Sequence, residues 1–159
     1  MTNNDDKNLS VYKNIIQDGI IEAKKGNFLK SNELFLKAKN IDPINHITYI
    51  NQSNLHILQK DIIKSVSILE NYIQKFDYNF DILIHYWKIS IRYNLKERLN
   101  TFLTNILHDN TKKNNKYLLY FLLGKYNNFT GKFHEAYKYY NKCIENNSSF
   151  KEAHFEHRL

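Results

Sequence analysis

The chain has 159 residues, of which 42% are hydrophobic, four are glycine and one is proline, and its net charge is +7 at pH 7. This length and apolar content are enough for one folded domain and exclude global disorder, while the scarcity of Gly and Pro favours helices over a turn-rich β fold. The excess of lysine accompanies frequent Asn, Ile, Tyr and Phe, as in translation of an AT-rich genome. We therefore interpret the charge as compositional rather than as a nucleic-acid-binding feature.

The N-terminal part of the chain predicts a tail followed by two helices. Residues 1–10 are polar and unlike a signal peptide, and we expect them to be a disordered tail. Apolar residues at helical spacing predict a helix over residues 11–24, and Gly26 is suited to the left-handed conformation that ends a helix. A second helix is predicted over residues 28–40, and Pro43 prevents its continuation.

Positions of this first helix pair recur along the chain at fixed offsets. Copies start at residues 19, 53, 87 and 124, in steps of 34, 34 and 37 residues. The clearest correspondence joins Gly19, Gly26, Ser31, Phe35, Ala38 and Pro43 to Gly124, Gly131, Ala136, Tyr140, Cys143 and Ser148. A fixed period in the thirties indicates stacked repeats. We expect an array over residues 11–150 with helix–turn–helix repeats at about 12–45, 46–79, 80–116 and 117–150.

The two middle copies depart from this pattern. The second keeps small residues at Ser53 and Ser65 but has no turn glycine. The third has Trp87 and Leu99 where the small pair belongs, so we expect its two helices to be splayed and the groove around Trp87 to be kinked or widened. The three extra residues of the last step fit best in the polar loop at 109–116.

The C-terminal segment, residues 151–159, begins what resembles the first helix of a fifth copy. Two interpretations stay open: it is a helix that caps the apolar end of the stack, or it is a fifth repeat cut short. His154 and His157 lie three residues apart in this segment. No metal-binding motif accompanies them, and we interpret them as part of a solvated helix.

The last copy carries a resemblance to a known family. It contains Tyr120, Leu123-Gly124, the run GKFHEA over residues 131–136, Tyr140 and Cys143. With the first copy, it resembles the tetratricopeptide repeat family, and the resemblance covers roughly residues 12–148. It implies an all-α fold: a right-handed α-solenoid of about four helix pairs plus a C-terminal helix. It also implies a non-enzymatic module for protein–protein interaction.

In this family the first helix of each pair lines a concave groove that receives a peptide. Carried over by position, the groove residues are Ile16, Ile20, Ile50, Asn51, Asn54, Ile57, Ile84, His85, Lys88, Ile91, Phe121, Lys125 and Asn128. The resemblance therefore implies a protein partner whose peptide has apolar anchors and an acidic group. The alternative, that the isoleucines only pack between neighbouring helices, stays open.

No catalytic motif is present. The chain contains no G-x-S-x-G, P-loop, G-x-G-x-x-G, HExxH or CxxC motif, and we expect Cys143 to be a small core residue. We therefore predict no enzymatic activity, no cofactor and no metal. The lone cysteine, the absence of a signal peptide and an apolar run of only residues 117–123 favour a cytoplasmic protein without a membrane partner.

Two alternative functions remain. The resemblance allows the chain to be the N-terminal regulatory region of a longer enzyme, such as a sulfotransferase or glycosyltransferase, which the downstream gene sequence would decide. RNA binding of the pentatricopeptide type is less favoured, because the last copy has the wrong glycine spacing and no regular polar code is visible. The identity of the partner and the oligomeric state are not determined by the sequence.

Overall fold

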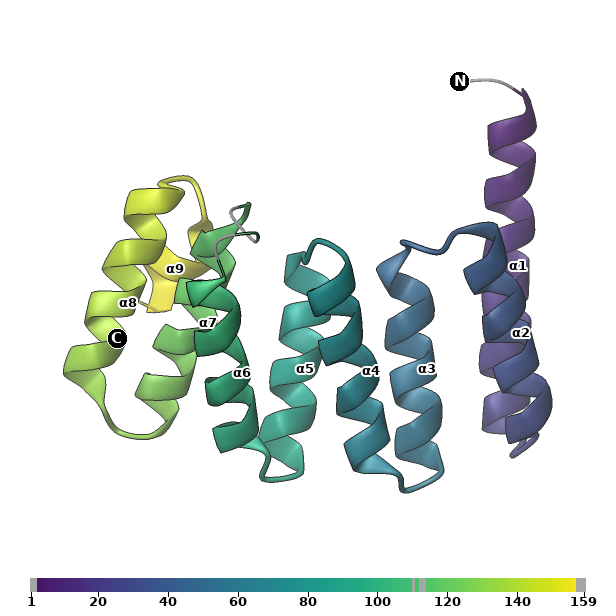
Figure 1. Cartoon of the computed structure of the whole chain (residues 1–159), viewed down its shortest axis with the longest axis horizontal. Helices are drawn as coiled ribbons and strands as arrows, with labels where there is room; N and C mark the ends of the chain where they lie inside the picture. The colour runs from purple at the N-terminus through teal and green to yellow at the C-terminus, as the bar shows by residue number, and fades with distance from the viewer. Residues whose placement is uncertain (1–2, 110, 112–113, 157–159) are drawn as a thin grey trace. The chain divides into compact units, whose positions relative to one another are not determined.

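The computed structural model describes residues 3–109, 111 and 114–156 of the chain. In these residues the protein is all-α, with nine helices and no strand (Figure 1). The helices are α1 (Asn3–Lys24), α2 (Phe28–Ile41), α3 (His46–Leu58), α4 (Ile62–Lys75), α5 (Phe80–Arg92), α6 (Lys96–His108), α7 (Lys116–Phe129), α8 (Phe133–Asn146) and α9 (Lys151–Glu156). The expected four helix pairs followed by a C-terminal helix are confirmed.

The expectation of a disordered N-terminal tail is wrong for the described residues. Helix α1 begins at Asn3, so residues 3–10 are helical, while residues 1–2 lie outside the described part. The chain has neither glycine nor proline before Gly19, so a helix formed over the packed residues of α1 meets no breaker towards the N-terminus. A polar composition alone does not oppose helix formation.

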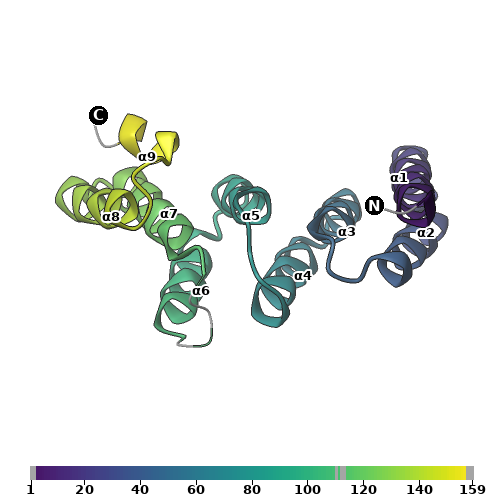
Figure 2. The same ribbon diagram turned by 90° about the horizontal axis from the view of Figure 1, so that it is seen from above.

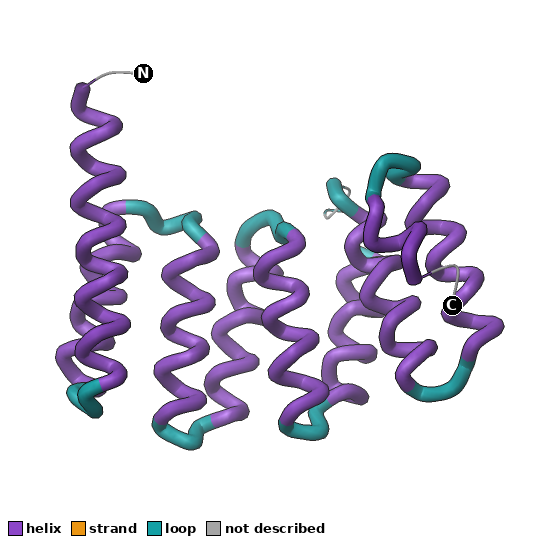
Figure 3. Tube along the Cα trace, turned by 180° about the vertical axis from the view of Figure 1, so that it is seen from behind, coloured by secondary structure: helices purple, strands orange, loops and turns teal. Residues whose placement is uncertain are grey.

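The helices divide between two compact units. Unit 1 is Met1–Phe76 and holds α1 to α4, and unit 2 is Asp77–Leu159 and holds α5 to α9. Figure 3 shows that, within each unit, short loops alternate between the two ends of successive helices, so that neighbouring helices run antiparallel. Each unit therefore contains two helix pairs, and unit 2 contains α9 in addition.

All four pairs use the same turn between their two helices. The residue at the turn position has a positive φ in every pair: 82° at Gly26, 62° at Lys60, 56° at Asn94 and 76° at Gly131. In each case the N–H of the next residue donates to the carbonyl five positions earlier, over 2.7–2.9 Å. This is the hydrogen-bond pattern of a glycine-terminated helix. The second and third pairs thus form the turn without the glycine.

Replacing Lys60 by glycine is expected to stabilise the protein by about 0.5–1 kcal/mol, because a left-handed conformation is costly for any side chain with a Cβ. Asn94→Gly is the matched control and should gain less, since asparagine tolerates this conformation better than lysine. Urea unfolding followed by far-ultraviolet circular dichroism measures both changes. An equal or larger gain for Asn94→Gly would contradict the explanation.

Small residues hold the helix pairs of unit 1 close together. The Ser31 hydroxyl donates to the Gly19 carbonyl at 2.8 Å. The Phe35 ring lies against the same glycine, where a Cβ atom would be only 2.5 Å from a ring carbon. In the second pair the hydroxyls of Ser53 and Ser65 form a 2.8 Å hydrogen bond, and both side chains are fully buried. The recurring small positions are thus contacts between the helices of a pair.

The third pair, α5 and α6, packs less closely than the other three, in agreement with the expected splaying. Leu99 is fully buried, but Trp87 is half-buried and its ring meets the edge of Phe129 in α7, with centroids 6.1 Å apart. Tyr86 and Phe102 fill the space between α5 and α6, in an edge contact at 5.7 Å. The bulky Trp87 is therefore turned towards the next pair.

Candidate functional site

The groove residues expected in unit 1 lie on α1 and α3 and differ in exposure. Ile16 is buried in the core with Tyr12, Phe35 and Leu55. Asn54 is exposed. The half-buried members of the set are Ile20, Ile50, Asn51 and Ile57. Ile16 therefore serves packing, while the half-buried residues and Asn54 remain available on the surface.

The groove residues expected in unit 2 lie on α5 and α7. Lys88 is exposed and Phe121 is buried. The half-buried members are Ile84, His85, Ile91, Lys125 and Asn128. The structure brings Ile84, Phe121 and Lys125 together at one pocket of about 410 Å³. This is the place in unit 2 where the expected residues converge.

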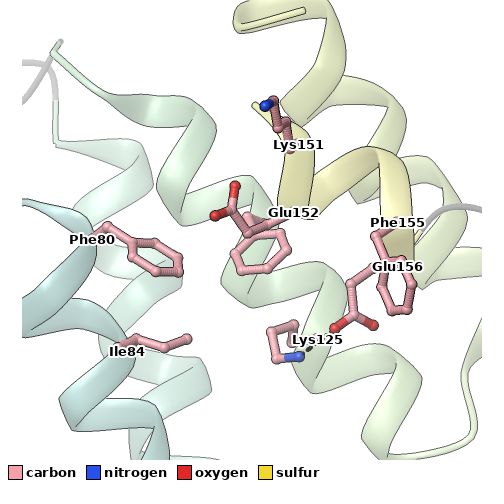
Figure 4. A pocket seen from close by; sticks show the side chains of 8 residues that line it. Phe80, Ile84, Lys125, Lys151, Glu152, Phe155 and Glu156 are labelled. Carbon is pink, nitrogen blue, oxygen red and sulfur yellow. Dashed lines mark hydrogen bonds and ion pairs between the residues drawn. The ribbon is translucent and has the colours of Figure 1, made fainter. Parts of the chain in front are cut away.

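Helix α9 supplies the remaining wall of this pocket. In Figure 2, α9 lies beside α7 on the side away from α6. Figure 4 shows Phe80 and Ile84 reaching towards the pocket from α5, with the α9 side chains opposite them. The lining residues that the sequence did not predict are Phe80, Lys151, Glu152, Phe155 and Glu156. Phe80 could have been found, since it lies one helical turn before Ile84 on the same face.

An aromatic cluster forms the floor of the pocket. The ring of Phe121, which is 3% exposed, lies 6.1 Å from Phe80, 5.2 Å from Phe150 and 6.2 Å from Tyr140 between centroids. Tilted and edge-on contacts of this kind stabilise aromatic pairs. The floor is therefore apolar and rigidly packed, and it suits an apolar side chain of a ligand.

The polar element of the pocket is the ammonium group of Lys125. Its Nζ lies 2.6 Å from Glu156 Oε1, 5.6 Å from the centre of the Phe121 ring and 5.9 Å from that of Trp87. The side chain is 23% exposed, so solvent only partly screens its charge. Aromatic faces attract cations. The two rings thus help to hold the ammonium in place, and Glu156 neutralises it.

His85 lies beside this region on α5 and is half-buried. Burial lowers the pKa of its imidazole, and the nearby charge of Lys88 lowers it further. Its Nε2 atom is buried and has no hydrogen-bond partner among the described residues. His85 does not line the pocket. It therefore contributes no positive charge there, and Lys125 and Lys151 are the cationic residues of the lining.

Cys143 and the histidines of the C-terminal segment are the residues that the sequence raised as candidates for chemistry. Cys143 is fully buried, and burial raises the pKa of its thiol to about 12, so the nucleophilic thiolate is scarce at neutral pH. No cluster of three or more His, Cys, Asp or Glu residues is placed to hold a metal ion in the described ranges. His154 Nε2 lies 2.7 Å from the Ser148 carbonyl oxygen, and His157 is outside the described residues.

The helices were also searched for a membrane-spanning segment. None of the described helices is both long enough and apolar enough to cross a bilayer.

Comparison with known proteins relates the chain to solved structures. No protein-family model and no curated protein matches the sequence. PilF of Pseudomonas aeruginosa is similar with a TM-score of 0.56 and 16% identity, over 95% of this chain and 68% of that one. PilW, a type IV pilus biogenesis factor, is similar with a TM-score of 0.52 and 17% identity, over 90% of this chain and 65% of that one. A tetratricopeptide repeat protein from Parabacteroides merdae is similar with a TM-score of 0.52 and 17% identity, over 92% of this chain and 57% of that one.

These similarities establish the fold. The identities are low, and this chain spans less than two thirds of the PilW and Parabacteroides chains. The structural similarities, the turns shared by the four pairs and the small-residue contacts together show that the chain has the tetratricopeptide-repeat fold.

Proposed function

We propose that this chain, with its tetratricopeptide-repeat fold, is a non-enzymatic module that binds a peptide segment of a partner protein at the pocket of unit 2. One observation carries the proposal: the first helices α5 and α7 join an aromatic floor to a partly buried ammonium group at a pocket of about 410 Å³. Apolar lining with few polar groups is typical of binding sites.

The pocket suits a peptide that carries an apolar side chain next to a carboxylate. The apolar side chain would contact Phe80, Ile84 and Phe121, which line the pocket. The carboxylate would accept hydrogen bonds from the Lys125 ammonium, and hydrogen bonds between charged groups are stronger than neutral ones. Because Phe80 and Ile84 lie one turn apart on α5, and Phe121 and Lys125 one turn apart on α7, both walls present a regular stripe to an extended segment.

Removing the ammonium group tests the proposal. Peptides selected by display on the whole chain are expected to be acidic and apolar, and Lys125→Ala should weaken their binding about tenfold, because a charged hydrogen bond is lost. The single tryptophan, Trp87, lies beside Lys125, so its emission can report the titration.

The matched control is Lys142→Ala. Lys142 is an exposed residue of α8 whose ammonium also lies over aromatic rings, those of Tyr120 and Tyr139, but it does not line the pocket. This variant loses the same charge and should bind the peptides as the wild type does. Unchanged affinity in Lys125→Ala, or equal losses in both variants, would contradict the proposed site.

A further inference from the structure

Helix α9 makes a contact that bears on how the pocket is occupied. The Glu156 carboxylate meets the Lys125 ammonium at 2.6 Å, and the two side chains are only 19% and 23% exposed (Figure 4). A ligand carboxylate would need this same ammonium. We propose that Glu156 occupies the position of the partner's carboxylate, so that α9 is an internal competitor which the partner peptide displaces. This inference rests on the proposed function.

The ammonium is held on more than one side. Besides Glu156, Lys125 lies over the rings of Phe121 and Trp87, which belong to the packed helices α7 and α5. These rings attract the cation whether or not a carboxylate is present. When Glu156 leaves, Lys125 therefore stays in position to receive another carboxylate, as an exchangeable site requires.

Helix α9 is attached through few contacts. Ala153 is its one fully buried residue in the described range, and Phe155 is 69% exposed. Among the described residues, the Lys125–Glu156 pair and the contact of His154 with the Ser148 carbonyl also hold it. Displacing residues 151–156 thus exposes little apolar surface.

The space beside the ion pair gives a partner its first point of contact. Phe80 and Ile84 line the pocket together with Phe155, whose ring is 69% exposed to solvent. An apolar side chain can therefore enter while Glu156 is still paired, and the neighbouring carboxylate then competes for Lys125. The geometry selects ligands that carry both groups, because either group alone leaves half of the site unused.

Small probes with and without the charge test the competition. We choose 3-phenylpropanoate, which joins an aromatic ring to a carboxylate, and the neutral 3-phenylpropanamide of the same shape. In the whole chain, Glu156→Gln is expected to bind 3-phenylpropanoate about fivefold more tightly than the wild type, as for loss of a partly exposed competing ion pair. The amide should bind both proteins equally. The indole N–H signal of Trp87 in nitrogen-15 spectra reports the titration.

Glu145→Gln is the matched control. Glu145 is an exposed residue of α8 that does not line the pocket. This variant changes the net charge equally and should bind the probe as the wild type does. The competition is refuted if Glu156→Gln gains no affinity, or if Glu145→Gln gains as much. A purely structural role for Glu156 would loosen α9 without this gain.

A second measurement follows α9 itself. Adding 3-phenylpropanoate to the wild type should speed hydrogen exchange of the α9 amides, because the probe displaces Glu156. Unchanged exchange at a saturating probe concentration would overturn the inference.

Failure of the proposed function gives a different result. Selected peptides would then bind Lys125→Ala as tightly as the wild type, whatever the behaviour of Glu156→Gln.

Discussion

Replacing Phe121 by alanine is expected to lower the free energy of unfolding of unit 2 by about 3–5 kcal/mol, the usual cost of removing a buried aromatic ring. Phe121 is 3% exposed and touches Phe80, Tyr140 and Phe150, so its loss leaves a cavity between α5, α7 and the loop before α9. The sequence placed this residue in the groove. Its main energetic role is in the core beneath the pocket.

The control for this prediction is Phe155→Ala at the same pocket. Phe155 is 69% exposed, and its replacement should change stability by less than about 0.5 kcal/mol. Urea unfolding followed by Trp87 emission measures both variants, because Trp87 lies in the same unit. A loss below about 1 kcal/mol for Phe121→Ala, or similar losses in the two variants, would show that the ring is not part of a packed core.

Replacing Gly124 by alanine is expected to lower the stability of unit 2 by about 2 kcal/mol, although alanine is the better helix former. Two effects oppose each other. Alanine gains about 1 kcal/mol within a helix. However, its Cβ would lie 2.5 and 2.6 Å from two ring carbons of Tyr140, which is 2% exposed and packed between α7 and α8. The ring cannot move without disturbing its neighbours, so the steric cost exceeds the gain.

A double-mutant cycle isolates this clash. With Tyr140→Ala as the background, Gly124→Ala should become neutral or stabilising, because the ring that meets the new Cβ is gone. Both steps can be followed by urea unfolding with Trp87 emission. If Gly124→Ala costs as much in that background as in the wild type, the loss has another origin than the contact with Tyr140.

The sequence predicted the helix pairs well because the signals that define a pair are local. The small residues Gly19 and Ser31 are 12 positions apart, and the Ser31 hydroxyl does bond the Gly19 carbonyl. The same offset joins Ser53 to Ser65. In the second pair, however, the missing glycine did not change the turn. The turn at Lys60 has the same hydrogen-bond pattern as the turn at Gly26. Packing of the two helices therefore imposes the left-handed backbone conformation on Lys60.

The prediction of the site was less complete. Position within the repeat placed Ile84 and Lys125 on the inner face of their helices, and both residues line the pocket of unit 2. It could not separate Phe121, which is buried, from its half-buried neighbours, because exposure depends on what covers a residue. Nor could it place residues 3–10, whose polar composition is compatible with both a tail and a helix.

The sequence alone determined the repeat period, the turns at Gly26 and Gly131 and the small-residue contacts of the first two pairs, because these signals recur at fixed offsets along the chain. The tertiary structure decided where α9 lies and what Lys125 contacts. Lys125 and Glu156 are 31 positions apart, and no spacing rule predicts on which side of α7 the last helix packs. That packing places a carboxylate of the chain on the ammonium group that we propose to bind the partner.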